Sequence, residues 1–152
     1  MQVTLALGSN LGDRHAILAD ARRLIVQRIG PLLAESTLLE TKAWGVTEQP
    51  DFLNQVIIVT SDPISGADAG AKKISLKATL HRLLDLTQGI ELELGRARKT
   101  HWGPRTCDVD IIFVDDLRYE DERLSLPHPW WEVRGFVGGI IRAELTHRLP
   151  GL

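Results

Sequence analysis

Hydrophobic and polar residues alternate at the start of the chain, and this period of two predicts a β-strand over Gln2–Gly8. Between Asp13 and Ile29 the apolar residues instead recur at helical spacing, which predicts an amphipathic helix. Its apolar face consists of Ile17, Ala21, Leu24, Ile25 and Ile29. Asp13 is a favourable N-cap residue, and Gly30-Pro31 is a pair that ends helices. The chain therefore begins with a strand followed by a helix.

The next part of the chain has extended character. Leu32–Thr41 is a mixed segment that we expect to be extended, and Leu53–Ser61 is rich in β-branched residues, as largely buried strands are. We predict that these two segments pair as a long hairpin. The small and polar residues of 62–75 predict a flexible linker or surface loop.

A second helical stripe of apolar residues extends from Leu76 to a stop at Gly95. It is made of Leu76, Leu80, Leu83, Leu84, Thr87, Ile90 and Leu94. Strand character returns over Cys107–Val114, and Asp115-Asp116 is typical of a turn. We expect an irregular segment to follow, and then a closing helix over Phe136–Leu149.

The order of these elements is β-α-β-β-α-β followed by a helix. This order predicts an α+β fold, a ferredoxin-like α/β sandwich whose mainly antiparallel sheet has its flanking helices on one face. The length of 152 residues is that of one domain, so we expect residues 1–152 to fold as a single unit.

Composition narrows the class of protein. Hydrophobic residues make up 43% and charged residues 25% of the chain, which is typical of a soluble globular protein. The formal net charge of −2 at pH 7 gives no overall positive field for nucleic acid or an anionic membrane. No apolar run is long enough to span a bilayer. The single cysteine, Cys107, favours a reducing compartment, so we expect a cytoplasmic protein.

Charge is sharply separated late in the chain. Residues 96–107 contain four cations and no acid, whereas residues 108–122 contain seven acids and one arginine. Such a junction suits a polyphosphate with a divalent cation, because arginines hold phosphate oxygens and carboxylates hold the cation. The alternative is a solvated basic loop beside an acidic turn.

Asp108 and Asp110 form an Asp-x-Asp pair within the last predicted strand. Residues two apart share a face of a strand, so both carboxylates are expected to converge, with Cys107, Val109, Ile111 and Phe113 on the other face. Two adjacent carboxylates repel each other unless a cation lies between them. An oxygen-only site beside a phosphate favours Mg²⁺. The alternative is an ordinary exposed pair without a metal.

Three further residues have both a functional and a structural interpretation. Trp102 either stacks on a flat heteroaromatic ring or fixes its polar loop to the core. His128 either donates a proton or contacts a phosphate, or it is structural. Asn54 either contacts a ring amide of a ligand or caps the turn that precedes its strand.

Taken together, the motifs resemble the 6-hydroxymethyl-7,8-dihydropterin pyrophosphokinase family of folate biosynthesis, over roughly residues 3 to 137. The matching segments are 7–12 (LGSNLG), 40–45, 49–54 (QPDFLN), 95–98 (GRAR), 102–106 (WGPRT), 108–110 (DVD), 126–128 (LPH) and 134–136 (RGF). The resemblance implies transfer of the terminal pyrophosphate of ATP to the pterin hydroxymethyl group, with release of AMP.

The resemblance also implies the roles of individual residues. The carboxylates that hold two Mg²⁺ ions are Asp108 and Asp110. The catalytic set is Arg96, Arg105, Asp108, Asp110 and His128. The pterin-binding set is Thr41, Gly45, Phe52, Asn54, Trp102 and Phe136. The ATP-binding set is Gln88, Glu91, Arg98, Arg105, Ile111, Arg123, Ser125, His128 and Arg134.

The chain also departs from the family pattern. Ala43 stands where proline is usual, and Pro129 follows His128 where an aromatic residue is common. The linker over 62–75 is longer than usual, and the tail from Val137 lacks the typical pattern. These departures remove neither carboxylate, and the resemblance implies loops that close over the site.

Two alternative functions remain open at this point. One is a ferredoxin-like nucleic-acid binding module that would use the basic loop, although the net charge and the lack of an RNA-recognition motif disfavour it. The other is a Mg²⁺-dependent phosphohydrolase. For the main interpretation we expect a monomer with ATP and the pterin as its only partners, and neither nucleic acid nor membrane.

Overall fold

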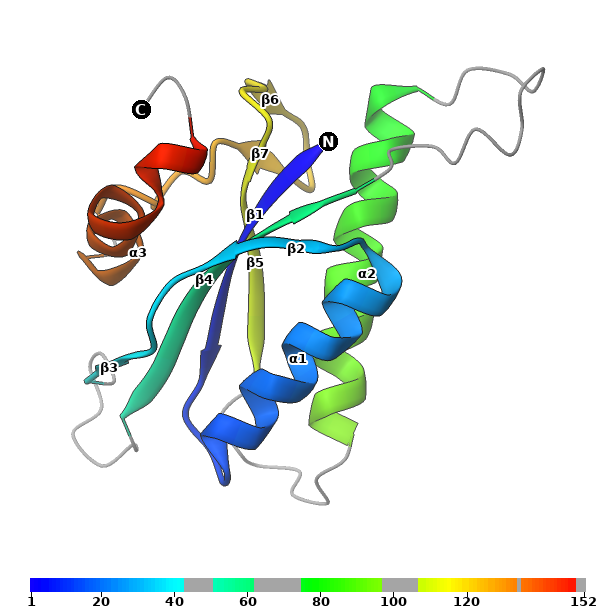
Figure 1. Ribbon diagram of the computed structural model, residues 1–152. Helices are drawn as coiled ribbons and strands as arrows, with labels where there is room; N and C mark the ends of the chain where they lie inside the picture. The colour runs from blue at the N-terminus through cyan, green and yellow to red at the C-terminus, as the bar shows by residue number, and fades with distance from the viewer. Residues whose placement is uncertain (43–50, 62–74, 97–106, 134, 150–152) are drawn as a thin grey trace.

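A computed structural model describes residues 1–42, 51–61, 75–96, 107–133 and 135–149 (Figure 1). Among these residues, an antiparallel sheet is flanked by helices, so the predicted α+β sandwich is confirmed. In this described part of the chain, no helix combines the length and the apolar character needed to cross a bilayer.

The sheet is built around its first strand. The strands β1 (Gln2–Ser9), β2 (Leu32–Glu35), β4 (Phe52–Thr60) and β5 (Asp108–Val114) lie in the order β2-β4-β1-β5, and every pair is antiparallel. A further short strand, β3 (Leu39–Thr41), pairs with residues 52–54 of β4, whereas β2 pairs with residues 57–59. The predicted hairpin is therefore confirmed, with its first arm divided into β2 and β3.

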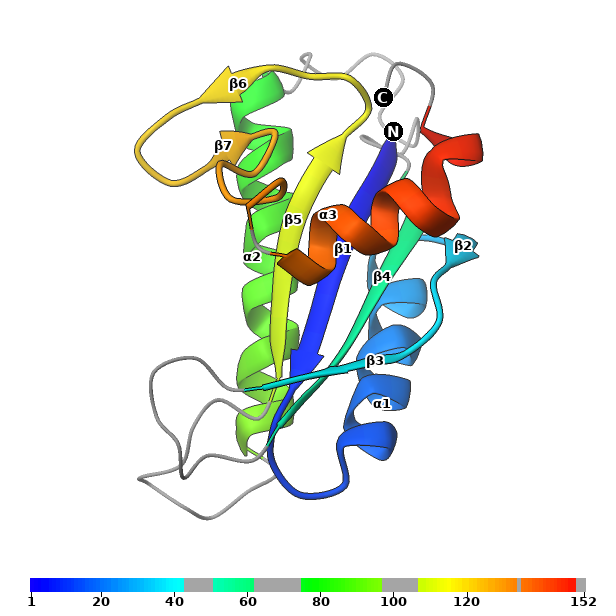
Figure 2. The ribbon, with the colours of Figure 1, turned by 90° about the vertical axis from the view of Figure 1, so that its left-hand side faces the viewer.

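Helices cover both faces of this sheet. The two helices that lie between strands share one face, as predicted, whereas the sequence did not predict that the closing helix covers the other face. Figures 1 and 2 show α1 (Arg14–Arg28) and α2 (Leu76–Arg96) on one face and α3 (Gly135–Ile140) crossing the other. The closing helix continues from α3 as a π-helical turn over Ile141–Leu145 and a 3₁₀ turn over Thr146–Arg148. The central strands have apolar side chains on both faces, so α3 can pack on the face opposite α1 and α2.

Two hydrophobic clusters separate along these faces. The cluster under α1 and α2 includes Leu5, Leu7, Ile25, Ile57, Leu80 and Ile90. The cluster under the C-terminal helices includes Ala6, Val56, Ile58, Trp131, Val137 and Ile141. Residues 3–9 of β1 are all buried, as are residues 53–59 of β4, which accounts for the continuous apolar run in β4.

The alternation predicted for the last strand holds only as far as Ile111. The pairing register between β1 and β5 shifts between Thr4 and Leu5, which inserts an extra residue into β5. As a result Phe113 packs with the cluster under the C-terminal helices, at 4.9 Å from the Trp131 ring in an edge-on geometry. The prediction that Phe113 shares a face with Val109 was therefore wrong.

The helix ends follow local chemistry. The Asp13 side chain accepts a hydrogen bond from the Ala16 N–H at 3.1 Å, so the predicted N-cap of α1 is confirmed. The Ser75 hydroxyl accepts one from the Ala78 N–H at 3.1 Å at the start of α2. Helix α2 continues one residue past Gly95. Apart from Ser75, the predicted linker lies outside the described residues.

A short hairpin lies where the sequence predicted only an irregular segment. It consists of β6 (Tyr119–Glu120) and β7 (Ser125–Leu126), which pair antiparallel beside α2 (Figure 2). Strands of two residues are too short to show a period of two, so no sequence pattern could reveal them.

A backbone contact at Gly30 generates a first prediction. A Cβ at this position would overlap the carbonyl oxygen of Thr60 and lie 2.8 Å from its carbonyl carbon, whereas a Cβ at Gly89 within α2 would have nothing within 4 Å. We expect Gly30→Ala to lower the free energy of unfolding by at least about 2 kcal/mol. Gly89→Ala should raise it by up to about 1 kcal/mol, because alanine is the better helix former.

Urea denaturation followed by circular dichroism measures both changes. Equal stabilities of the two variants would contradict the close approach of the Gly30 and Thr60 backbones.

Candidate active site

A row of three paired residues crosses the sheet near the end of β1. In the antiparallel register Gly8 pairs with Asn54 on one side and with Asp108 on the other. Directly paired residues share a face of a sheet, so the side chains of Asn54 and Asp108 flank the glycine on one face. This face is the one that the C-terminal helices cover, because Ala6, two residues before Gly8, belongs to their cluster.

The second carboxylate lies one step along the same face. Asp110 pairs with Ala6, which in turn pairs with Val56. Asp108 and Asp110 are both half-buried, in contrast to the buried Val109 between them on the opposite face. The prediction that the two carboxylates share a face is therefore confirmed.

Gly8 lies close to the side chains of Asn54 and Phe52. A Cβ at Gly8 would lie 3.2 Å from Asn54 Oδ1 and 3.7 Å from Phe52 Cδ1. Contacts at 3.2 Å are tighter than carbon and oxygen normally accept, so any side chain here would press on the amide. On the other side of Gly8, the two aspartates offer carboxylate oxygens only, which suits a hard cation such as Mg²⁺.

The predicted pterin-binding residues on the sheet lie together. Thr41 pairs with Phe52 at the end of β3, and the Asn54 side chain donates to Thr41 Oγ1 at 2.8 Å and to Leu39 O at 3.1 Å. Asn54 is 2% exposed. Its amide hydrogens therefore tie β3 to β4, and Oδ1 is the atom on the side of Gly8.

Helix α2 positions the start of β5. Glu91 Oε2 accepts a hydrogen bond from the Val109 N–H at 2.9 Å, between the two aspartates in the chain. Burial, and then the charges of Asp108, Glu91 and Asp110, raise the pKa of the Cys107 thiol to about 12. These three carboxylates therefore create a negative potential around Cys107.

The LPH motif is tied to the middle of β5. The His128 N–H donates to Ile112 O at 2.9 Å, and His128 Nδ1 accepts a hydrogen bond from the Trp130 N–H at 3.1 Å. A neutral imidazole that accepts at Nδ1 carries its proton at Nε2. Phe136 on α3 is half-buried against the cluster of that face. The Trp130 contact at Nδ1 thus suits a neutral His128 that donates from Nε2.

Other predicted nucleotide residues lie elsewhere on the framework. Gln88 is exposed on α2, Arg123 lies in the β6–β7 turn, and Ser125 is half-buried on β7. The side chain of Ile111 is 3% exposed in the cluster under α1 and α2, on the opposite face from the aspartates. An Ile111 contact with nucleotide would therefore have to come from its backbone.

Several predicted site residues lie outside the described residues. They are Gly45, Arg98, Trp102, Arg105 and Arg134, and the departure at Ala43 lies there too. Arg96 is the last residue of α2. The basic cluster and the predicted closing loops over 42–49 and 96–105 therefore remain predictions.

Two polar residues at the end of β1 had no role in the sequence interpretation. Ser9 and Asn10 are both 0% exposed, and neither Ser9 Oγ nor either amide atom of Asn10 bonds to a described residue. Buried polar atoms normally have partners, so these atoms mark a polar end to the central strand. In the sequence, only their position within the LGSNLG motif could have indicated that these two residues belong to the site.

Arg14 links the elements around the same end of the sheet. Its guanidinium donates to Glu40 Oε1 at 2.6 Å and to Asp51 O at 2.8 Å. Glu40 and Asp51 lie on either side of residues 43–50 in the chain. A single side chain from α1 therefore joins the two described flanks of that segment.

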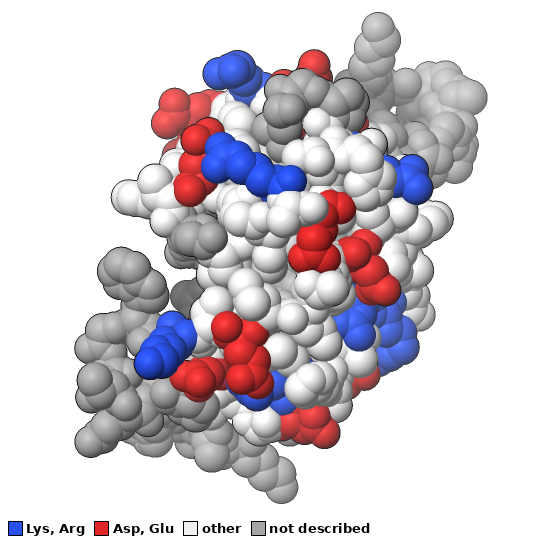
Figure 3. All heavy atoms as spheres, turned by 60° about the vertical axis from the view of Figure 1, so that its left-hand side comes forward, with Lys and Arg blue, Asp and Glu red and all other residues white. Residues whose placement is uncertain are grey.

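Figure 3 shows the surface charge on one face of the molecule. Lysine and arginine side chains alternate there with aspartate and glutamate side chains, and the acidic groups lie beside the basic ones. Among the residues that the structure describes, that face has no continuous basic field of the kind that binds a nucleic-acid backbone.

Comparison with known proteins identifies a family. The sequence model of the 7,8-dihydro-6-hydroxymethylpterin-pyrophosphokinase (HPPK) family matches residues 4–143. A protein of Bacillus subtilis (strain 168) named 2-amino-4-hydroxy-6-hydroxymethyldihydropteridine pyrophosphokinase is 39% identical over 134 residues, which cover 88% of this chain and 71% of that protein. A protein of the same name from Porphyromonas gingivalis is 37% identical over 139 residues, covering 89% of this chain and 84% of that one.

A longer relative contains the same region as one of its parts. The "Bifunctional protein FolKE" of Lactococcus lactis subsp. lactis is 37% identical over 132 residues, which cover 84% of this chain and 33% of that protein. The family match covers nearly the whole of this chain and includes every motif that the sequence analysis singled out. The chain therefore belongs to the 7,8-dihydro-6-hydroxymethylpterin-pyrophosphokinase family.

Proposed function

We propose that this protein transfers the terminal diphosphate of ATP to the hydroxymethyl group of 6-hydroxymethyl-7,8-dihydropterin, a step of folate biosynthesis. The family name describes this pyrophosphokinase activity, and membership implies ATP as the co-substrate. The observation that carries the proposal is the row Asn54–Gly8–Asp108, with Asp110 one step along the same face. In this arrangement the amide of Asn54, which we assign to the pterin ring, lies on the same face of the sheet as the carboxylate pair.

Asp108 and Asp110 are the residues that would hold Mg²⁺. Their shared face and their carboxylate oxygens fit this ion. Bound there, Mg²⁺ would supply positive charge that neutralises the phosphates. The resemblance of the motifs to the family favours two ions, and this number is part of the proposal.

Asn54 would recognise the edge of the pterin through its carbonyl oxygen. Its amide hydrogens are directed to Thr41 Oγ1 and Leu39 O, so the oxygen is the atom suited to accept from a ring N–H. Phe52 and Phe136 supply aromatic surface on the same side, and we propose that Trp102 completes the stacking around the ring. Gly45 is the remaining proposed contact.

The nucleotide would extend from the aspartates toward α2 and the β6–β7 hairpin. We assign it Gln88 and Glu91 on α2, Arg123 and Ser125 on the hairpin, and a backbone contact at Ile111. His128 is suited to donate from Nε2 to a phosphate oxygen, since its Nδ1 accepts from Trp130. The cations Arg96, Arg98, Arg105 and Arg134 would bind the phosphates.

In this proposal the reaction is a displacement at the β-phosphorus. The pterin hydroxyl oxygen forms a bond to that phosphorus, the bond to the α-phosphate oxygen breaks, AMP leaves and the hydroxyl proton is released. Little covalent chemistry falls to the protein. Its residues hold the two substrates in line and place positive charge where negative charge develops.

Two expectations about the state of the protein also stay proposals. We propose that it acts as a monomer, since both substrates are small molecules. We propose a cytoplasmic location on the basis of the single cysteine, which is buried and free.

An assay of the nucleotide product tests the proposed function. The protein is incubated with Mg²⁺, ATP and the hydroxymethyl pterin, and nucleotides are separated by chromatography. We expect AMP that forms only when pterin is present. Formation of ADP, or hydrolysis of ATP without pterin, would indicate a phosphohydrolase or another transferase instead.

The same assay tests the assignment of the aspartates. Asp110→Ala should lower turnover by roughly 100-fold or more, because a carboxylate ligand is lost. The matched control is Asp116→Ala, which removes an exposed carboxylate from the turn after β5 and should leave turnover unchanged. Wild-type turnover of Asp110→Ala at saturating Mg²⁺ would refute the metal assignment.

Gly8→Ala tests whether the site needs a residue without a side chain beside Asn54. The added methyl group would press on Asn54 Oδ1, so we expect KM for the pterin to rise by about tenfold while the protein stays folded. Gly139→Ala is the control, because a Cβ there has nothing within 4 Å. An unchanged pterin KM in Gly8→Ala would show that the site does not need a glycine here.

A further inference from the structure

Asp121 is a hub in the turn between β6 and β7. Its Oδ2 accepts a hydrogen bond from the Tyr119 hydroxyl at 2.5 Å and lies 2.6 Å from His81 Nε2 on α2. Its Oδ1 accepts from the backbone N–H groups of Arg123 at 2.7 Å and Leu124 at 2.9 Å. One carboxylate therefore fixes the turn that carries Arg123 and joins that turn to α2.

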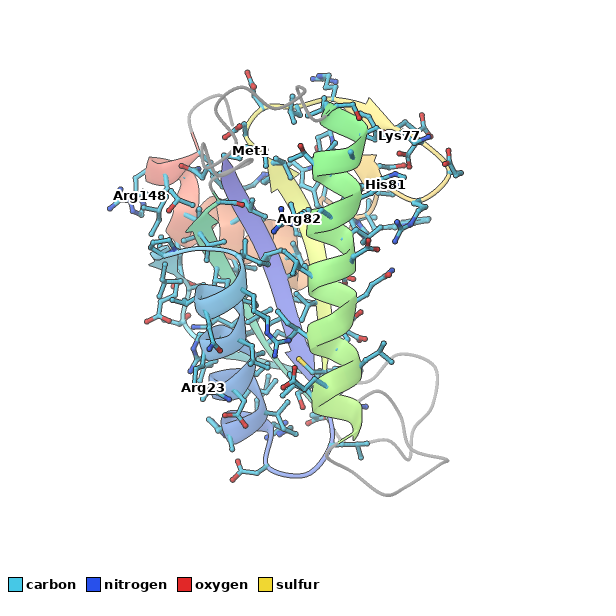
Figure 4. The ribbon with its side chains drawn as sticks, turned by 90° about the vertical axis from the view of Figure 1, so that its right-hand side faces the viewer. Met1, Arg23, Lys77, His81, Arg82 and Arg148 are labelled. Carbon is cyan, nitrogen blue, oxygen red and sulfur yellow. The ribbon has the colours of Figure 1, made fainter. Side chains whose placement is uncertain are left out.

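Helix α2 presents a polar stripe to this turn. Lys77, His81, Asp85 and Gln88 follow one another at spacings of three or four residues, which puts them on one face of the helix. Figure 4 shows Lys77 and His81 on the side of α2 that faces the hairpin. His81 contacts Asp121 itself, and Lys77 Nζ lies 3.3 Å from Oε1 of the next residue, Glu122.

Arg123 returns from the turn to the other end of the stripe. Its Nη2 donates to Asp85 Oδ1 at 2.7 Å and lies 3.5 Å from Gln88 Oε1. Arg123 and Gln88 are both residues that the proposed function assigns to the nucleotide. The ion pair with Asp85 therefore holds the guanidinium beside a second nucleotide residue.

The groups of the hub are less exposed to solvent than the acidic groups of the ion pairs around it. The side chains of Asp121 and His81 are 8% and 18% exposed, whereas those of Asp85 and Glu122 are 64% and 70% exposed. Exposed ion pairs add little to stability, so the Asp85 contact is better suited to orient Arg123 than to hold the fold. The Asp121 carboxylate, whose side chain is largely shielded and has four partners, fixes its neighbours in place.

The pKa shifts of Asp121 and Tyr119 follow from the hydrogen bond between them. The hydrogen bond from Tyr119 is the main cause that holds the pKa of Asp121 well below its usual range. The same bond is the main cause that raises the pKa of Tyr119 to about 12. Both shifts favour the pair of a neutral phenol and a carboxylate.

A metal site is the alternative use of the same groups. Ligand atoms of His81, Asp121 and Glu122 lie within 4.8 Å of one another. However, Asp121 Oδ2 already contacts the Tyr119 hydroxyl and His81 Nε2, and Asp121 Oδ1 accepts hydrogen bonds from two backbone N–H groups. Glu122 is paired with Lys77. The contacts therefore favour a structural hub over a cation site.

We propose that Asp121 and Asp85 are positioning residues for the nucleotide: Asp121 fixes the β6–β7 turn on α2, and Asp85 orients the Arg123 guanidinium beside Gln88. This inference rests on the assignment of Arg123 and Gln88 to ATP in the proposed function. It predicts that both aspartates act on ATP and not on the pterin, which binds at the sheet.

Kinetics of Asp121→Asn against Glu122→Gln test the hub. Both changes remove one negative charge from the same turn, but only the first removes the charged acceptor of Tyr119 and His81. We expect Asp121→Asn to raise KM for ATP by about tenfold with KM for the pterin within twofold, and Asp85→Asn to do the same to a smaller extent. Glu122→Gln should leave both KM values unchanged.

A double-mutant cycle separates positioning from a general loss of structure. If Asp121 acts through Arg123, then Asp121→Asn in an Arg123→Ala background should change KM for ATP by less than about twofold. Multiplicative effects of the two substitutions, or equal rises in both KM values, would overturn the proposal. A marked rise in melting temperature of the wild type with Zn²⁺ alone, absent in Asp121→Asn, would favour the metal site instead.

The tyrosine titration tests the hub without any turnover. Tyr119 is the single tyrosine of the chain, so tyrosinate absorbance reports on it alone. We expect a midpoint near pH 12 in the wild type and in Glu122→Gln, and one near the ordinary value of about 10 in Asp121→Asn. Because the folded pKa is the higher one, the bond stabilises the fold fully below pH 10 and loses its effect as pH rises toward 12.

Circular dichroism at each pH checks that the protein remains folded through the titration. A wild-type midpoint near 10 in folded protein would overturn the hub. Failure of the proposed function would appear differently, as a wild type that forms no pterin-dependent AMP but still titrates near pH 12.

Discussion

The structure depends on the antiparallel pairing of β1 with both β4 and β5. This strand is paired along residues 2–9 with β4 and along residues 3–8 with β5, so its backbone hydrogen bonds are directed to neighbours on both sides. Burial on both faces follows, with one cluster under α1 and α2 and another under the C-terminal helices. A slip of one residue in either register would move Asn54 or Asp108 to the opposite face of the sheet. The candidate active site is thus a consequence of register more than of any single contact.

Much of this fold could be predicted from periodicity, because long elements repeat their pattern several times. The helix after Asp13 and the strand after Phe52 are examples of such elements. The hairpin β6–β7 could not be predicted, because two residues do not make a period. The position of Phe113 was mispredicted because a shift in register reverses the faces of a strand, and such a shift leaves no trace in local sequence. Coverage of both sheet faces was missed for a similar reason, since it depends on where the C-terminal helices pack.

The site divides in the same way between local and long-range information. The shared face of Asp108 and Asp110 followed from their spacing alone, as did their suitability for a cation. That Asn54 stands across Gly8 from Asp108 depends on two long-range pairings, which only the fold provides. The partners of Arg123 likewise come from a helix that is 35 or more residues earlier in the chain. The resemblance to a family supplied these residues as a set but not the contacts between them.

Helix α2 connects the two halves of the proposed site. Near its C-terminal end Glu91 holds the Val109 N–H between the two aspartates, and toward its N-terminal end His81 and Asp85 hold the turn that carries Arg123. The groups on the sheet side are acidic, and their charges help to raise the pKa of Cys107 to about 12. A polyphosphate cannot approach such a negative potential unless cations accompany it. In the proposed function, Mg²⁺ at the aspartates and arginines around them would supply this positive charge. Helix α2 orients one of these proposed arginines, Arg123, through Asp85.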